Sequence, residues 1–289
     1  MPGAALSNNS TGNSKATATA LRIVARHLKH LGIPHNRLLV LSTSNHVTLQ
    51  VSNTIVARVS ISNRRMLART RREIDVSRFL AEQNAPVIRP TSQFNPGPYQ
   101  LEKCLLSYWT FIERSHKANK SRRPCLESLK QCHRALRNFS APLPHFHEEI
   151  ERCLSSLRRG RAKRFLPKDD RLFLIGIHDH LWRTLQPLRF SEQALHGDAH
   201  SGNTIETSEG LLWGDFESSC RGPIEWDLAS LPDSPAIRRG ADRDLLCLLR
   251  DLRSWCVAVW CWASFDAAEE KRDAARFHLG RLRKKFSLQ

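Results

Sequence analysis

The spacing of hydrophobic residues changes along the chain, and the change falls near residue 113. In residues 20–31, Leu21, Val24 and Leu28 recur at the interval of a helix. Residues 37–62 then alternate apolar and polar positions, with two short polar breaks. This alternation predicts an antiparallel arrangement of about three strands.

A second helix and further strands are predicted to complete this first part. Strong helix formers fill Arg64–Gln83, and an Asn-Ala-Pro turn follows them. Residues 98–113 return to the alternating pattern and predict one or two more strands. The first part should therefore be an antiparallel sheet crossed by one long helix.

Beyond residue 113 the pattern is mostly helical, and only residues 193–216 carry loop and strand signals. The segments with a 3.6-residue period are Leu126–Phe139, His145–Leu157, Asp170–Leu185 and Asp242–Phe265. We expect an α+β protein with a disordered lead-in over residues 1–19, an N-terminal lobe over residues 20–113 and a C-terminal lobe over residues 114–289.

Charge and cysteine content narrow the choice of partners and compartment. The formal net charge of +17 favours contact with anionic partners such as nucleotides, nucleic acid or acidic surfaces. The eight cysteines form no Cys-x-x-Cys pair, and the N-terminus has no secretory pattern, so we expect a cytoplasmic protein. The apolar run Ser254–Phe265 is too short to span a bilayer, which argues against membrane insertion.

Three oxygen-bearing side chains suggest phosphoryl-transfer chemistry. The loop "HGDAHSGN" places Asp198 five residues before Asn203, and the apolar strand "GLLW" ends at Gly214 and Asp215. Magnesium prefers carboxylate and amide oxygens, and an acceptor hydroxyl needs a carboxylate to orient it and take its proton. This spacing can direct all three side chains into one site.

These residues also carry a resemblance. The protein-kinase pattern is H-R-D-x-x-x-x-N followed by D-F-G, and this chain reads His196-Gly197-Asp198, then Asn203, then Asp215-Phe216-Glu217. Together with "GPIEWDLA", the pattern resembles the aminoglycoside phosphotransferase and choline kinase family, the small-molecule branch of the protein-kinase-like fold. The residues that carry this resemblance lie within about 35 positions, 195–229.

The resemblance implies a two-lobed, protein-kinase-like α+β fold and a role for each matching residue. Asp198 would be the catalytic base, and Asn203 and Asp215 would hold Mg²⁺. The structural supports of the loop would be His196, His200 and Asp227.

The N-terminal lobe should then bind ATP or GTP. Arg58 stands where kinases carry a lysine, and a planar guanidinium pairs with a carboxylate in a different geometry from a lysine ammonium group. Its expected partner is Glu73, with Asp75 as the alternative. The loop Ser42–Asn45 contains no glycine, and Ser44 is its candidate phosphate contact.

The resemblance places the base-binding hinge at Phe111, Ile112 and Glu113. The acceptor remains open: an aminoglycoside antibiotic would imply resistance, but the net positive charge disfavours a strongly cationic substrate. A neutral or anionic hydroxylated metabolite fits at least as well.

Two other functions stay open at this stage. A kinase-like protein could bind nucleotide without turnover. A basic nucleic-acid-binding module would account for "RRMLARTRRE" and "RLRKK", but no base-reading motif accompanies them. The tryptophans at 255, 260 and 262 are interpreted as core packing, with a substrate-pocket wall as the alternative.

Overall fold

Packing divides the chain into two compact units. The structure is a computed structural model that describes residues 8–35, 37–43, 46–115, 123–264 and 269–286. One unit combines residues 1–139 with residues 202–218, and the other combines residues 140–201 with residues 219–289. The predicted lobe boundary at residue 113 stays a prediction, because the two compact units divide the chain at other positions.

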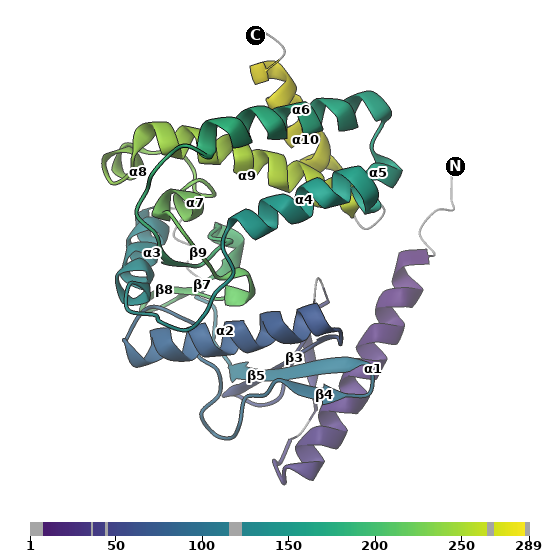
Figure 1. The fold of residues 1–289 in the computed structure, drawn as a ribbon. Helices are drawn as coiled ribbons and strands as arrows, with labels where there is room; N and C mark the ends of the chain where they lie inside the picture. Colours follow the sequence, from purple (N-terminus) through teal and green to yellow (C-terminus); the bar gives the residue numbers. More distant parts are fainter. Residues whose placement is uncertain (1–7, 36, 44–45, 116–122, 265–268, 287–289) are drawn as a thin grey trace. The chain divides into compact units, whose positions relative to one another are not determined.

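A five-stranded antiparallel sheet forms the centre of the first unit (Figure 1). Its strand order is β1-β2-β3-β5-β4, and β3 and β5 pair from Ile55 with Thr110 to Ile61 with Cys104. The strands are β1 (Leu39–Ser42), β2 (Val47–Gln50), β3 (Ile55–Ile61), β4 (Tyr99–Leu101) and β5 (Cys104–Thr110). The alternating pattern of the sequence predicted these strands, because successive side chains of a strand point to opposite faces of the sheet.

Helix α1 (Asn8–His30) packs against one face of this sheet (Figure 1). Val24 and Leu28 lie in one buried cluster with Leu49 and Tyr108. The helix begins within residues 1–19, where we expected a disordered lead-in, and the alanine-rich stretch before Leu21 explains the difference because alanine favours helix.

Helix α2 (Arg64–Glu82) contributes to a buried cluster formed by the alternate side chains of the sheet. It begins where Asn63 Oδ1 accepts a hydrogen bond from the Met66 N–H at 2.8 Å, an N-cap. Ile74 of α2 clusters with Val56 and Trp109, whereas Ala57 belongs to the cluster with α1. Because strand side chains alternate, Arg58 shares the α2 face with Val56.

A short hairpin completes the first unit. It consists of β7 (Thr204–Thr207) and β8 (Gly210–Trp213), with the 3-10 turn η1 (Ser201–Asn203) before it and η2 (Phe216–Ser218) after it. Helix α3 (Arg123–Leu136) anchors the hairpin, since the buried Trp213 indole N–H donates to Ser128 Oγ at 2.9 Å.

The second unit is helical around one buried core. Its helices are α4 (His147–Arg159), α5 (Arg161–Phe165), α6 (Lys168–Leu185), α7 (Ile224–Leu228), α8 (Pro235–Arg239), α9 (Arg243–Ala263) and α10 (Glu269–Phe286), and its two strands are β6 (Gln193–Leu195) and β9 (Cys220–Gly222). Leu249, Trp255 and Val259 of α9 are fully buried in this core. No helix in the described ranges is long and apolar enough to cross a membrane.

Helix α10 was not predicted. It is mostly polar, and only a narrow stripe that includes Ala275, Leu279 and Leu282 is buried against the core. The predicted α+β class is confirmed: an antiparallel N-terminal sheet followed by a mostly helical remainder.

Candidate active site

The β7–β8 hairpin brings Asn203 and Asp215 to the same end of two paired strands. Thr204 pairs with Trp213, so Asn203 directly precedes one strand where Gly214 and Asp215 directly follow the other. The Gly214 N–H donates to the Asn203 carbonyl oxygen at 2.9 Å. The two predicted magnesium ligands are therefore neighbours within the first unit.

The conformation of Asp215 is unusual. Its φ is +64°, in the left-handed region that aspartate tolerates better than most residues. Its Oδ1 atom is buried and has no hydrogen-bond partner among the described residues. A buried carboxylate oxygen without a donor is costly, and a cation would satisfy it.

Arg58 and Glu73 form a partly buried ion pair within the same unit. Arg58 Nη1 lies 2.5 Å from Glu73 Oε1, and the guanidinium lies 5.4 Å from the centre of the Trp109 ring. Asp75 is exposed on the opposite side of α2, and no contact of it with Arg58 is seen among the described side chains. The geometry thus joins Arg58 to Glu73, the first of the two predicted partners.

Arg58 lies among more than one carboxylate. Burial raises the pKa of Glu73 to about 7; Arg58 opposes this increase, and the negative charges of Asp215 and Glu217 add to it. Burial disfavours the charge on Arg58, but the carboxylates of Glu73, Asp215 and Glu217 more than compensate and raise its pKa. A concentration of negative charge around Asp215 is the electrostatic setting that a divalent cation stabilises.

Two residues near this cluster escaped the sequence analysis. Arg69 Nη1 lies 2.9 Å from Glu217 Oε1, and His46 Nε2 lies 3.7 Å from Glu217 Oε2. Burial lowers the pKa of His46 to about 4, with Arg58 adding to the decrease, so the imidazole is neutral near pH 7. Ser44, the predicted phosphate contact two residues earlier, lies outside the described residues.

The predicted hinge lines a cavity of about 570 Å³ in the first unit. Phe111, Ile112 and Glu113 form one wall, and the turn of the β7–β8 hairpin contributes another. The Phe111 N–H already donates to the Thr54 carbonyl oxygen at 2.9 Å. Polar contacts between Phe111–Glu113 and a ligand would therefore have to use backbone groups other than the Phe111 N–H.

In the second unit, Asp227 holds the loop that carries Asp198. Its Oδ2 accepts the His196 N–H at 2.9 Å and its Oδ1 accepts the Gly197 N–H at 2.8 Å. Asp227 and His196 are fully buried, and His196 Nδ1 lies 3.3 Å from the Asp198 N–H. Two backbone donors bound by one carboxylate fix the backbone of this loop.

Asp198 itself is paired with Arg253, a residue that the sequence analysis did not select. Arg253 Nη2 donates to Asp198 Oδ1, and Nη1 donates to the Gly197 carbonyl oxygen at 3.1 Å. The guanidinium lies 4.9 Å from the Trp226 ring centre and 5.3 Å from that of Trp260. The Arg253 side chain, only 6% exposed, is therefore locked in place beside the candidate base.

A cavity of about 440 Å³ opens beside Asp198. His200 lines it, and its Nε2 atom lies 3.7 Å from Asp198 Oδ2. Trp260 forms part of the wall, whereas Trp255 and Trp262 are buried in the core. The core interpretation thus holds for two of the three tryptophans, and the pocket-wall interpretation holds for the third.

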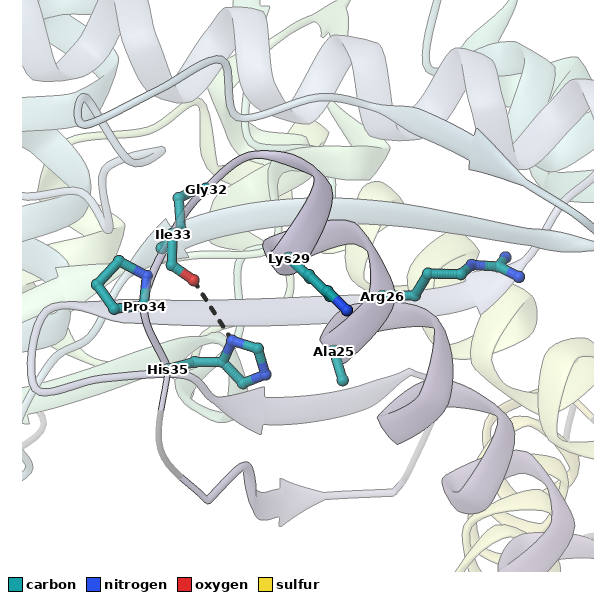
Figure 2. A pocket seen from close by; sticks show the side chains of 7 residues that line it. All are labelled: Ala25, Arg26, Lys29, Gly32, Ile33, Pro34 and His35. Atoms are coloured by element: carbon teal, nitrogen blue, oxygen red, sulfur yellow. Dashed lines mark hydrogen bonds between the residues drawn. The ribbon is translucent and has the colours of Figure 1, made fainter.

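A larger cavity, of about 660 Å³, lies at the end of α1 (Figure 2). Arg26, Lys29 and His35 line it, and His35 Nδ1 lies 3.4 Å from the Ile33 carbonyl oxygen. None of the predicted site residues that the structure describes lines this cavity. Size alone does not identify an active site, and the predicted site residues line the two smaller cavities: Phe111, Ile112 and Glu113 line one, and Asp198 and His200 line the other.

Comparison with a family model assigns the chain to a known family. Residues 39–269 match the model of the phosphotransferase enzyme family. No curated protein matches the chain.

Solved structures of kinases share the fold at low sequence identity. The amicoumacin kinase hAmiN, in complex with AMP-PNP, Ca²⁺ and Ami, superposes with a TM-score of 0.73 at 13% identity, over 95% of this chain and 96% of that one. The GDP complex of wild-type aminoglycoside 2'-phosphotransferase-IIIa gives 0.67 at 13% identity, over 92% and 97%.

Choline kinase LicA from Streptococcus pneumoniae is similar to the same degree, with a TM-score of 0.67 at 14% identity, over 93% of this chain and 99% of that chain. The family match covers most of the sequence, and these likenesses extend over nearly the whole chain. The chain therefore belongs to the phosphotransferase enzyme family and is an enzyme with the protein-kinase-like α+β fold.

Proposed function

We propose that this enzyme transfers the γ-phosphoryl group of ATP, with GTP as the alternative donor, to a hydroxyl of a small molecule. One observation carries the proposal: Asn203 and the buried, unsatisfied Oδ1 of Asp215 stand together at the end of one hairpin. An amide oxygen and a carboxylate are the donors that Mg²⁺ accepts when phosphates and water complete its shell.

The residues present fit such an ion. Asn203 and Asp215 would hold it, and when bound it would neutralise charge on the nucleotide phosphates. The solved structure of hAmiN contains AMP-PNP and Ca²⁺ together, which supports the pairing of a nucleotide with a divalent cation in this fold.

The first unit offers contacts for the rest of the nucleotide. Arg58 would bind phosphate oxygens, held in place by Glu73 and by the Trp109 ring. The cavity along Phe111–Glu113 would take the base, with backbone groups of Ile112 and Glu113 as its polar contacts. Ser44 is retained as a candidate contact to phosphate.

Asp198 would orient the acceptor. In the proposed reaction the acceptor oxygen forms a bond to the γ-phosphorus, the bond to the β,γ-bridging oxygen breaks, and the nucleoside diphosphate leaves with that electron pair. The hydroxyl proton passes to Asp198 and then to solvent. Transfer of this kind depends mainly on positioning and charge stabilisation.

The supporting residues of the loop would act through Asp198. His196 and Asp227 hold its backbone, and His200 approaches its second oxygen.

All eight cysteines are free, so we place the enzyme in the reducing cytoplasm.

Nucleotide titration tests the proposal. Asp215→Asn should weaken Mg²⁺-dependent binding of ATP, measured by calorimetry, by roughly 100-fold, because it removes an anionic ligand from the ion. Asp75→Asn, a change of the same kind at an exposed position of the same unit, should leave binding unaltered. ATP binding that withstands both EDTA and Asp215→Asn would disprove the magnesium assignment.

The competing function is nucleotide binding without turnover. It predicts tight Mg²⁺-dependent binding but no release of nucleoside diphosphate with any acceptor of a broad hydroxyl panel. The similar structures include an amicoumacin kinase and a choline kinase, so the fold by itself does not select the acceptor.

A further inference from the structure

The cavity beside Asp198 carries more positive than negative charge. Among the described residues, its charged lining consists of the three arginines Arg250, Arg253 and Arg281 and one carboxylate, Asp198. A cavity of about 440 Å³ is within the range that holds a small molecule. An electropositive cavity next to the candidate base bears directly on which hydroxyl compounds can bind there.

The carboxylates behind these arginines do not cancel the excess. Asp233 lies 2.8 Å from Arg250 but also contacts Arg238. Asp251 lies 3.3 Å from Arg281 and 2.5 Å from Lys285. Each of these two carboxylates is thus shared by two cations, and the cluster carries five cations against three carboxylates when Asp198 and Arg253 are included.

The arginines differ in how far their donors are already used. Arg253 donates to Asp198 and to Gly197, and its guanidinium is covered by two tryptophan rings. Arg250 uses Nη1 on Asp233, but its Nη2 atom is buried and has no hydrogen-bond partner within the described part of the chain. Ser230 lines the same cavity, and its Oγ atom is likewise buried without a hydrogen-bond partner among the described residues.

These two buried polar groups without partners belong to residues that line one cavity, which indicates a missing acceptor. Oxygen atoms of an anion would accept from both the Arg250 guanidinium and the Ser230 hydroxyl. Arg250 and Arg253 lie three residues apart on α9, so their side chains start from the same face of the helix, with Cα atoms about 4.5 Å apart along its axis. Because Arg253 contacts Asp198, an anion bound by Arg250 and a hydroxyl at Asp198 would belong to one compact molecule.

We propose that the acceptor is a small hydroxylated compound with an oxyanion group, a carboxylate or a phosphate, which Arg250 and Ser230 bind while Asp198 orients the hydroxyl. This inference rests on the proposed function for the role of Asp198, but the anion subsite itself does not depend on turnover. Val257 and Trp260 give the remaining wall an apolar character that suits a short carbon skeleton. A polycationic sugar would face the three arginines and is excluded by their charge.

A matched series of three-carbon probes tests the subsite in the full-length, nucleotide-free protein. Glycerate, glycerol 3-phosphate, glycerol and 3-amino-1,2-propanediol share a skeleton and differ in charge. NMR titration should show at least one anionic probe binding about tenfold more tightly than glycerol, with the amine weakest. The two anionic probes distinguish a carboxylate from a phosphate as the group recognised.

Variants locate the binding. Arg250→Gln should remove the preference for the anionic probe, and Ser230→Ala should weaken it about threefold, which keeps the test valid if the arginine variant fails to fold. Arg238→Gln removes the same charge from the same ion cluster but lies outside the cavity lining, so the preference should persist.

The subsite is overturned if glycerol or the amine binds as tightly as both anions, or if the preference survives Arg250→Gln and Ser230→Ala. These outcomes are separate from those of the proposed function. Loss of Mg²⁺-dependent nucleotide binding would refute the phosphotransfer assignment while leaving a measured anion preference intact.

Discussion

Each unit contains an arginine that lies against an aromatic ring and pairs with a carboxylate. In the first unit the arginine is the more exposed partner of the pair, and in the second unit the carboxylate is. In the first unit Glu73 is 5% exposed and Arg58 is 21% exposed. In the second unit Arg253 is 6% exposed and Asp198 is 33% exposed. The buried partner in each pair holds the accessible one, so the first unit presents a cation and the second presents an anion. This reversal matches the proposed ligands, phosphates for Arg58 and a hydroxyl proton for Asp198.

The largest effect should follow from removing the accessible anion. Asp198→Asn keeps the shape of the side chain but loses the charge that accepts the hydroxyl proton, so kcat should fall by roughly 10²- to 10⁴-fold. The Kd for Mg²⁺-bound nucleotide should change little because Asp198 is not among its proposed ligands. Steady-state kinetics and calorimetry measure the two quantities.

Asp273→Asn, at an exposed position of α10, is the matched control and should behave as the unmodified enzyme. Turnover by Asp198→Asn at more than a tenth of the original rate would contradict the assignment of the base.

An intermediate effect should follow from removing the buried carboxylate of the other pair. Glu73→Gln leaves Arg58 without its closest counter-charge, so the guanidinium is held less firmly and the Kd for nucleotide should rise about tenfold. The expected change lies in nucleotide binding rather than in kcat for saturating substrates. Asp75→Asn on the same helix serves as control, and equal effects of the two changes would show that Glu73 has no special role.

The smallest effect should come from altering the buried cation while keeping its charge. Arg253→Lys preserves the attraction to Asp198 but loses the second hydrogen bond to Gly197 and the planar contact with the tryptophan rings. We expect kcat to fall about five- to tenfold while the KM for nucleotide stays constant. A change in nucleotide KM without any change in kcat would break the contrast between the two pairs.

The sequence was informative where neighbouring residues cooperate. Asp198, Asn203 and Asp215 lie within one short segment, and the paired strands of the hairpin follow from local alternation, so their chemistry could be recognised before the fold was known. The sequence named Glu73 first and Asp75 as the alternative partner of Arg58. It could not decide between them, because the choice depends on which face of α2 packs against the sheet.

The acceptor cavity could not be predicted in the same way. Arg253 follows Asp198 by 55 residues, and His278 and Arg281 lie on α10, whose narrow apolar stripe gave no clear helical signal. Arginines are common in this chain, and only tertiary packing distinguishes one that lines a cavity from one on a solvated surface.

The anchoring of the loop by Asp227 has a consequence for how acceptor specificity can diverge. The backbone of residues 196–197 is fixed from α7, whereas the cavity wall around Arg250 belongs to α9. On the proposed assignments of Asp198 and Arg250, exchange of Arg250 for residues of other charge would therefore change the acceptor without displacing the base. Arg253 touches both the loop and the cavity, and it is the position on this wall where adaptation to a new acceptor would cost catalytic competence.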